Sequence, residues 1–186
     1  MRSFVRCIAF SAVLGVAPAA AQSPFTFGLG GSLNVPLGDA SYGLGANSGA
    51  GWQGMGLLQI RPFRSRLGFQ LDGTYQPFGT MSALGSQSFN GTANVVYEFG
   101  RSRTSRVVPY VIGGAGVYNF REAGTTDATY HFGVNGGAGL SLRLFGPGSI
   151  FLESRLHNVF NAGLDSSGNA AARLIPITAG FKFTAP

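Results

Sequence analysis

Apolar and polar residues alternate along most of this chain, and this period of two is its strongest structural signal. In segment 25–37, for example, Phe27 and Leu29 share one face while Ser32 and Asn34 lie on the other. Successive side chains of a β-strand point to opposite faces, so the period predicts strands. Eight segments show it: 25–37, 52–61, 67–76, 89–99, 108–120, 130–144, 150–157 and 175–183.

The segments are long, and the connections between them alternate in length. Strands of soluble proteins usually have about 5–6 residues, whereas a tilted strand needs about 9–11 to cross a bilayer. An even number of strands, with short turns at one end and longer loops at the other, is typical of outer-membrane barrels. The sequence therefore predicts an all-β fold, an eight-stranded antiparallel up-and-down transmembrane β-barrel. The longer connections are 38–49, 78–88, 121–128 and 161–171, and the shorter ones are 62–66, 100–106 and 145–149.

Alternation alone does not decide which face of such a barrel meets lipid. A soluble barrel of the lipocalin type encloses its apolar face, whereas a membrane barrel exposes it. Charged residues make up only 11% of the chain, and a water-facing surface is usually about 25–35% charged. Aromatic residues gather near both ends of the segments, like the girdles of membrane barrels. We therefore expect lipid outside, with these aromatics at the membrane interfaces: Phe27, Trp52, Tyr75, Phe99, Tyr110, Phe132, Phe181 and Phe183.

The polar faces of the segments carry few charges, and these are of mixed sign. An eight-stranded barrel has an interior just wide enough for side chains to fill. Charges buried there need partners and hydrogen bonds. The sequence predicts a filled interior with a polar network formed by Asp72, Glu98, His131, Arg143, Glu153, Arg155, His157 and Lys182.

Residues 1–21 have the features of a secretory signal peptide, which leaves 22–186 as the barrel domain. Arg2 and Arg6 precede a short apolar stretch, and small residues follow it. Cys7 is the only cysteine of the chain. Removal of the signal would leave no disulfide, thiolate or cysteine-based metal site.

Basic residues gather at two of the short connections. The functional interpretation is that this basic end of the barrel contacts anionic phospholipid headgroups or the peptidoglycan side. The alternative is that turns simply tolerate charge. The residues are Arg61, Arg64, Arg66, Arg101, Arg103 and Arg106.

From Phe25 to Phe183 the chain resembles the small eight-stranded outer-membrane barrels of the OmpA/OmpX/OmpW-like group. Segments 109–117 and 174–183 are similar to strands of such proteins. The resemblance implies a porin-like protein of the bacterial outer membrane, with membrane lipids and the barrel-assembly machinery as partners. It also implies a monomer without a nucleic-acid partner. The fold alone does not imply an activity.

We expect a structural or narrow-channel role, without enzymatic activity or a cofactor. His131 and His157 lie on different segments and lack the spacing of zinc ligands. The stretch from His157 faintly resembles the active-site strand of lipid A deacylases, but Val159 stands where that family has serine. The alternatives are a barrel that binds or passes a small hydrophobic molecule, a soluble secreted ligand-binding barrel and, least favoured, a lipid-modifying enzyme.

Overall fold

The computed structural model describes residues 25–37, 51–62, 65–76, 87–99, 105–121, 129–144, 146–161 and 171–185. The predicted signal peptide and the domain boundary at residue 22 lie outside these residues. Among the described residues, no helix is long and apolar enough to cross a membrane. The strands are β1 (Phe25–Leu37), β2 (Gly51–Ile60), β3 (Leu67–Gln76), β4 (Gln87–Glu98), β5 (Val107–Arg121), β6 (Thr129–Arg143), β7 (Gly148–Val159) and β8 (Ala172–Thr184).

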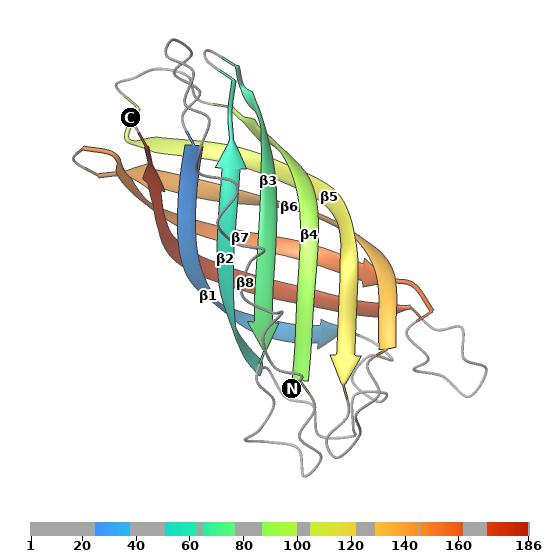
Figure 1. Cartoon of the computed structure of the whole chain (residues 1–186). Coiled ribbons are helices and arrows are strands. Elements are labelled where there is room, and N and C mark those ends of the chain that lie inside the picture. Colours follow the sequence, from blue (N-terminus) through green and yellow to red (C-terminus); the bar gives the residue numbers. More distant parts are fainter. Residues whose placement is uncertain are drawn as a thin grey trace, which may run out of the picture.

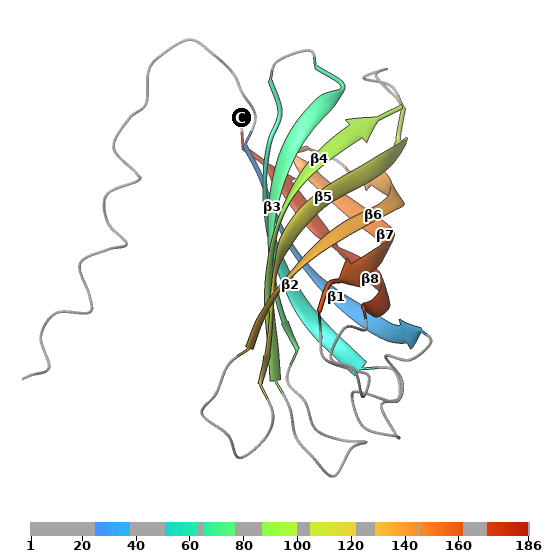
Figure 2. The same cartoon turned by 90° about the vertical axis from the view of Figure 1, so that its right-hand side faces the viewer.

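These strands form one closed antiparallel barrel in which each strand pairs with the next and β8 pairs with β1 (Figure 1). The β1–β8 closure runs from Thr26 opposite Thr184 to Leu37 opposite Arg173. In the view turned by 90°, the strands that form the barrel wall are seen to be tilted (Figure 2). Closure leaves no unpaired strand edge. The predicted eight-stranded up-and-down barrel is therefore confirmed.

The two faces of the wall differ sharply in polarity. Leu29 is 75% exposed on the outside, whereas Gln70 is fully buried on the inside. The buried side chains of β2, β3 and β4 are largely amides, hydroxyls and a carboxylate, while their outward neighbours are Leu, Val, Ile, Gly and aromatics. A soluble barrel with an apolar ligand cavity needs the opposite arrangement, so that alternative is wrong.

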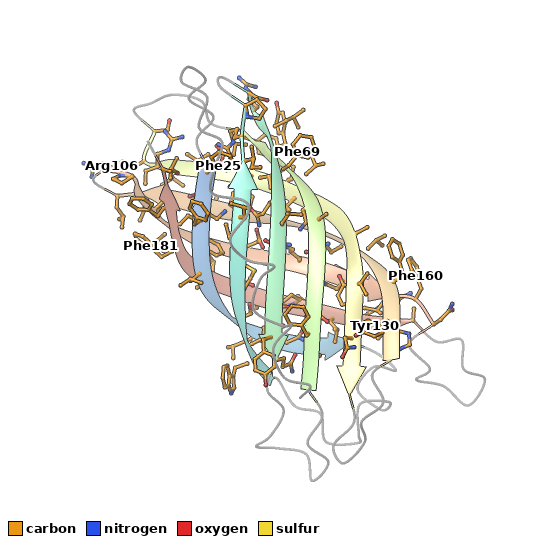
Figure 3. All side chains as sticks on the ribbon, in the orientation of Figure 1. Phe25, Phe69, Arg106, Tyr130, Phe160 and Phe181 are labelled. Atoms are coloured by element: carbon orange, nitrogen blue, oxygen red, sulfur yellow. The ribbon has the colours of Figure 1, made fainter. Side chains whose placement is uncertain are left out.

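Seven of the eight predicted interface aromatics lie on the outer surface. They are Phe27, Trp52, Tyr75, Phe99, Phe132, Phe181 and Phe183. Figure 3 shows two bands among its labelled residues: Phe25 and Phe69 lie toward the short-turn end, and Tyr130 and Phe160 toward the other end. This distribution is the one that membrane barrels place at their two interfaces.

The eighth residue of that set, Tyr110 on β5, was assigned to the wrong face. It is only 2% exposed and points inward, while Val111 is on the outside. Both faces of β5 are apolar, so hydrophobicity does not determine which one meets lipid. The registers that place Val111 opposite Tyr97 on β4 and Ala138 on β6 decide it. A buried tyrosine also needs a partner for its hydroxyl, and the interior provides one.

Candidate functional site

An ion pair crosses the barrel interior between opposite walls. Arg155 on β7 and Asp72 on β3 are four strands apart in a barrel of eight, which places them diametrically opposite each other. The Arg155 Nη1 atom lies 2.6 Å from Asp72 Oδ2, and the Arg155 side chain is 4% exposed. The pair therefore bridges the full width of the interior.

Asp72 is held by neutral donors from its own strand and the next one. Gln70 Nε2 and Asn94 Nδ2 each donate to the carboxylate at 2.8 Å, and Thr92 Oγ1 donates at 3.3 Å. Side chains two residues apart on a strand share a face, and the β3–β4 register brings Asp72 opposite Thr92. Hydrogen bonds of this kind offset the cost of burying a carboxylate.

Glu153 joins the same network from β7. Its Oε1 atom lies 2.5 Å from Arg155 Nε, and its Oε2 atom accepts a hydrogen bond of 2.9 Å from the Tyr110 hydroxyl. Arg155 thus uses two of its nitrogen atoms on two different carboxylates. Through Tyr110 the network also reaches β5, so three separate parts of the wall are tied together.

Lys182 on β8 completes the charge balance of this central network. Its Nζ atom lies 4.7 Å from the ring centre of Tyr110 and 4.6 Å from that of Phe151. Cations over aromatic faces gain electrostatic stabilisation where water is scarce. Two carboxylates, Asp72 and Glu153, therefore face two cations, Arg155 and Lys182.

A separate ion pair lies at the short-turn end. Arg61, just after β2, donates from Nη1 and Nη2 to the two carboxylate oxygens of Glu98 at the end of β4. This bidentate pair is partly buried. Glu98 was predicted to belong to one interior network with Asp72, but the structure gives it a pair of its own.

Three further residues, His131, Arg143 and His157, were predicted to belong to the interior network. His157 Nδ1 and the Tyr118 hydroxyl are 2.7 Å apart, toward the long-loop end. His131 on β6 is half-buried and lies opposite Tyr118. Arg143 is exposed at the short-turn end of β6, so its assignment to a buried network was wrong. Arg143 follows the alternation of the inward-facing residues of β6, but it is the last residue of the strand and its side chain is exposed.

Sequence reasoning missed several members of the site. Tyr110 was expected on the outside, and Tyr118, Phe151 and the amides Gln70 and Asn94 were not singled out. The signal for the amides was present, because they share a face with Asp72 and Thr92 in their strands. The same signal existed for Phe151, because it shares a face with Glu153 and Arg155 in β7.

The chemistry of this site is that of a charge-neutral cross-link. Among the described residues, no group of three His, Cys, Asp or Glu side chains is arranged to hold a metal ion. The described contacts of the central network join carboxylates, cations, amides and hydroxyls into hydrogen bonds and ion pairs. Such an arrangement fixes opposing walls and narrows the space between them.

A closed barrel with an apolar outer wall, aromatic bands and buried charges defines the class of integral outer-membrane β-barrels. The chain matches the family described as "Outer membrane protein beta-barrel domain" over residues 7–183. It belongs to that family and is a protein of the bacterial outer membrane. Comparison with curated proteins finds no match.

Solved structures share the fold at low sequence identity. Neisserial surface protein A (NspA) superposes with a TM-score of 0.63 at 13% identity, covering 86% of this chain and 96% of NspA. The N-terminal β-barrel domain of Pseudomonas aeruginosa OprF gives 0.55 at 13% identity, covering 88% and 100%. The outer membrane enzyme PagL gives 0.51 at 19% identity, covering 85% and 98%. At these identities the likeness concerns the fold alone.

Proposed function

We propose that this protein is a monomeric, non-enzymatic outer-membrane barrel with a structural role, whose interior passes at most small ions through a narrow path. The observation that carries the proposal is the Arg155–Asp72 ion pair between β7 and β3. It joins opposite walls, so any solute crossing the barrel must pass beside it.

The composition of the network supports a narrow path over an open one. Tyr110 and Phe151 fill space on the β5 and β7 sides, and both are buried. Arg155 Nη2, Gln70 Oε1 and Asn94 Oδ1 are buried without hydrogen-bond partners among the described residues. Buried polar groups of native proteins are usually paired with protein or water. Water or a small ion beside the ion pair would meet this need.

Two competing roles receive less support. A barrel that takes a hydrophobic molecule into its interior or passes it through the wall needs an apolar interior or a gap between strands. Here the interior around Asp72 is polar, and β8 pairs with β1 along both strands. A lipid-modifying enzyme needs a nucleophile near His157. That histidine contacts Tyr118 instead, and Val159 is a fully buried aliphatic residue.

Single-channel recording in planar bilayers tests the proposal. We expect the wild-type protein to give no current steps or only small ones. Arg155→Ala removes the bridge and leaves Asp72 and Glu153 with one cation, so we expect larger steps with a preference for cations. Arg173→Ala is the matched control, because Arg173 is exposed on β8 and outside the network.

Folding of each variant is checked by the gel-mobility shift that folded barrels show on heating. If Arg155→Ala fails to fold, the double variant Asp72→Asn, Arg155→Gln replaces it, because it removes one carboxylate and one cation together and leaves Glu153 with Lys182. Large persistent steps from the wild-type protein, or currents unchanged by both interior variants, would overturn the proposal. Release of fatty acid from lipid A by the wild-type protein would overturn its non-enzymatic part.

A further inference from the structure

The lipid-facing wall carries an apolar groove of about 710 Å³ across β8, β1, β2 and β3. Its walls are outward-pointing side chains, among them Phe27 on β1, Leu71 on β3 and Phe181 on β8. Gly56 and Gly73 lie opposite each other on β2 and β3 and form part of its floor. Leu57 and Asp72 of the inner face also border the groove, but most of its lining is outward and apolar, so the groove lies on the membrane side of the wall.

The floor glycines leave space that packing within the protein does not use. A Cβ atom added at Gly73 would meet nothing within 4 Å, and one at Gly56 would reach only Leu29 Cδ2 at 3.9 Å. By contrast, a Cβ at the inward-facing Gly137 would collide with backbone atoms of β7. Packing thus requires glycine at the interior position but leaves the groove floor open to an occupant from outside.

Arginines mark the end of the groove nearest the short turns. Arg61 ends the β2 side of the β2–β3 turn, and Arg66 precedes β3. Arg66 is exposed, and its Nη1 atom donates to the Tyr97 hydroxyl at 3.3 Å. From Leu71 to Arg66 the chain runs five residues, roughly 17 Å along a strand. That separation suits an acyl chain in the groove with its headgroup at the membrane surface.

A second groove repeats this combination on another part of the wall. It has a volume of about 440 Å³ and is lined mainly by outward residues of β5, β6, β7 and β8, including Val111, Leu140 and Leu152, together with the inward-facing Tyr110. Arg106 precedes β5 and Arg143 ends β6 at the same short-turn end. The described residues of the short-turn end thus include four arginines, Arg61, Arg66, Arg106 and Arg143, and one acidic residue, Glu98.

We propose that the larger groove binds an acyl chain of an anionic glycerophospholipid, and that Arg66 contacts the lipid phosphate. Short turns of outer-membrane barrels lie on the periplasmic side, so the lipid belongs to the periplasmic leaflet. Basic residues next to apolar membrane surfaces attract anionic headgroups. This inference requires a barrel in the membrane but does not depend on what the interior conducts.

The test compares lipid binding by native mass spectrometry of the folded, delipidated full-length mature protein. The probes are phosphatidylglycerol and phosphatidylethanolamine with identical acyl chains. We expect the wild-type protein to bind phosphatidylglycerol several-fold more tightly. Arg66→Gln should weaken phosphatidylglycerol binding about fivefold and phosphatidylethanolamine binding by less, because the ammonium group of that lipid offsets its phosphate charge. Arg173→Gln, at the other end of the barrel, should change neither.

Filling the groove should have a different signature. Gly73→Leu should weaken the binding of both lipids to a similar degree, because it removes space for the acyl chain. Gly91→Leu is the matched control. Gly91 pairs with Gly73 and its Cβ position is equally open, but it does not line the groove. If Gly73→Leu does not fold, Gly73→Ala replaces it.

Three results would overturn the proposal. They are equal binding of the two lipids by the wild-type protein, equal effects of Gly73→Leu and Gly91→Leu, and a dimer that Gly73→Leu dissociates. The last result would make the groove a contact between two copies of the chain. None of them bears on conduction through the interior, so the two proposals fail separately.

Discussion

Arg155 is the residue on which the interior depends most. It is buried and paired with Asp72 and Glu153, which come from opposite walls of the barrel. Buried pairs often add little net stability, but the loss of one partner leaves an uncompensated charge in a low-dielectric site. The same residue therefore restricts the interior and holds the network together.

Replacement of Arg155 by Met should destabilise the folded barrel by about 3–5 kcal/mol. The measurement is urea unfolding in phospholipid vesicles, followed by the fluorescence of Trp52, the only tryptophan. Adding Asp72→Asn should recover part of the loss, because Glu153 and Lys182 then remain as one carboxylate and one cation. A loss below that of the control Arg173→Met would contradict the assigned role of Arg155.

Glycines inside and outside the wall should respond oppositely to alanine. A Cβ at Gly137 would overlap the Ser154 carbonyl oxygen and lie 2.7 Å from Arg155 Cα. Gly137→Ala should therefore destabilise the barrel by about 1–3 kcal/mol, the usual cost of overpacking. Gly91→Ala meets open space and should stabilise it by about 0.5–1 kcal/mol. The same unfolding assay measures both, and equal effects would refute this distinction.

Single residues could be placed on a face from sequence, but their partners could not be identified. The period of two put Asp72 and Arg155 on the polar faces, where the structure also has them. It carries no information on strand register or on which opposing side chains meet across the interior. Arg143 shows a second limit, because alternation does not say where a side chain passes beyond the end of the wall.

Among the elements, β5 is where period-two reasoning failed. Its two faces are both apolar, so the choice between Tyr110 and Val111 required the registers with β4 and β6. In β3, by contrast, Gln70 and Asp72 alternate with Phe69 and Leu71, and polarity alone identifies the lipid side. Strands with one polar face are predictable, and strands without one are not.

The inward orientation of β5 predicts unequal effects of removing two tyrosine hydroxyls. Tyr110→Phe should destabilise the barrel by about 1–3 kcal/mol, because Glu153 loses a buried donor. Tyr75→Phe, on the outer surface, should stay within about 0.5 kcal/mol of the wild-type value. Unfolding in vesicles measures the pair. If the two variants behaved alike, Tyr110 would not be an interior residue.

For the whole molecule, the sequence predicted the fold, the strand number and the membrane location, and the structure and the family match agree. These properties follow from local patterns: alternation, strand length and alternating connections. The interior cross-link between β3 and β7 depends on the closure of the barrel and on contacts between residues 83 positions apart in the chain. Such contacts leave no local pattern. Nor does the fold settle the role, since structures with 13% and 19% identity include both a surface protein and an enzyme.

Solute permeation through the whole barrel is the most direct test that its interior is closed to all but small ions. Liposomes carrying the folded wild-type protein are diluted into solutions of small sugars, and their swelling is followed by light scattering. We expect the rate of protein-free liposomes, because Arg155 and Asp72 join the opposite walls. Rapid swelling in small sugars would show a continuous wide path and contradict the account.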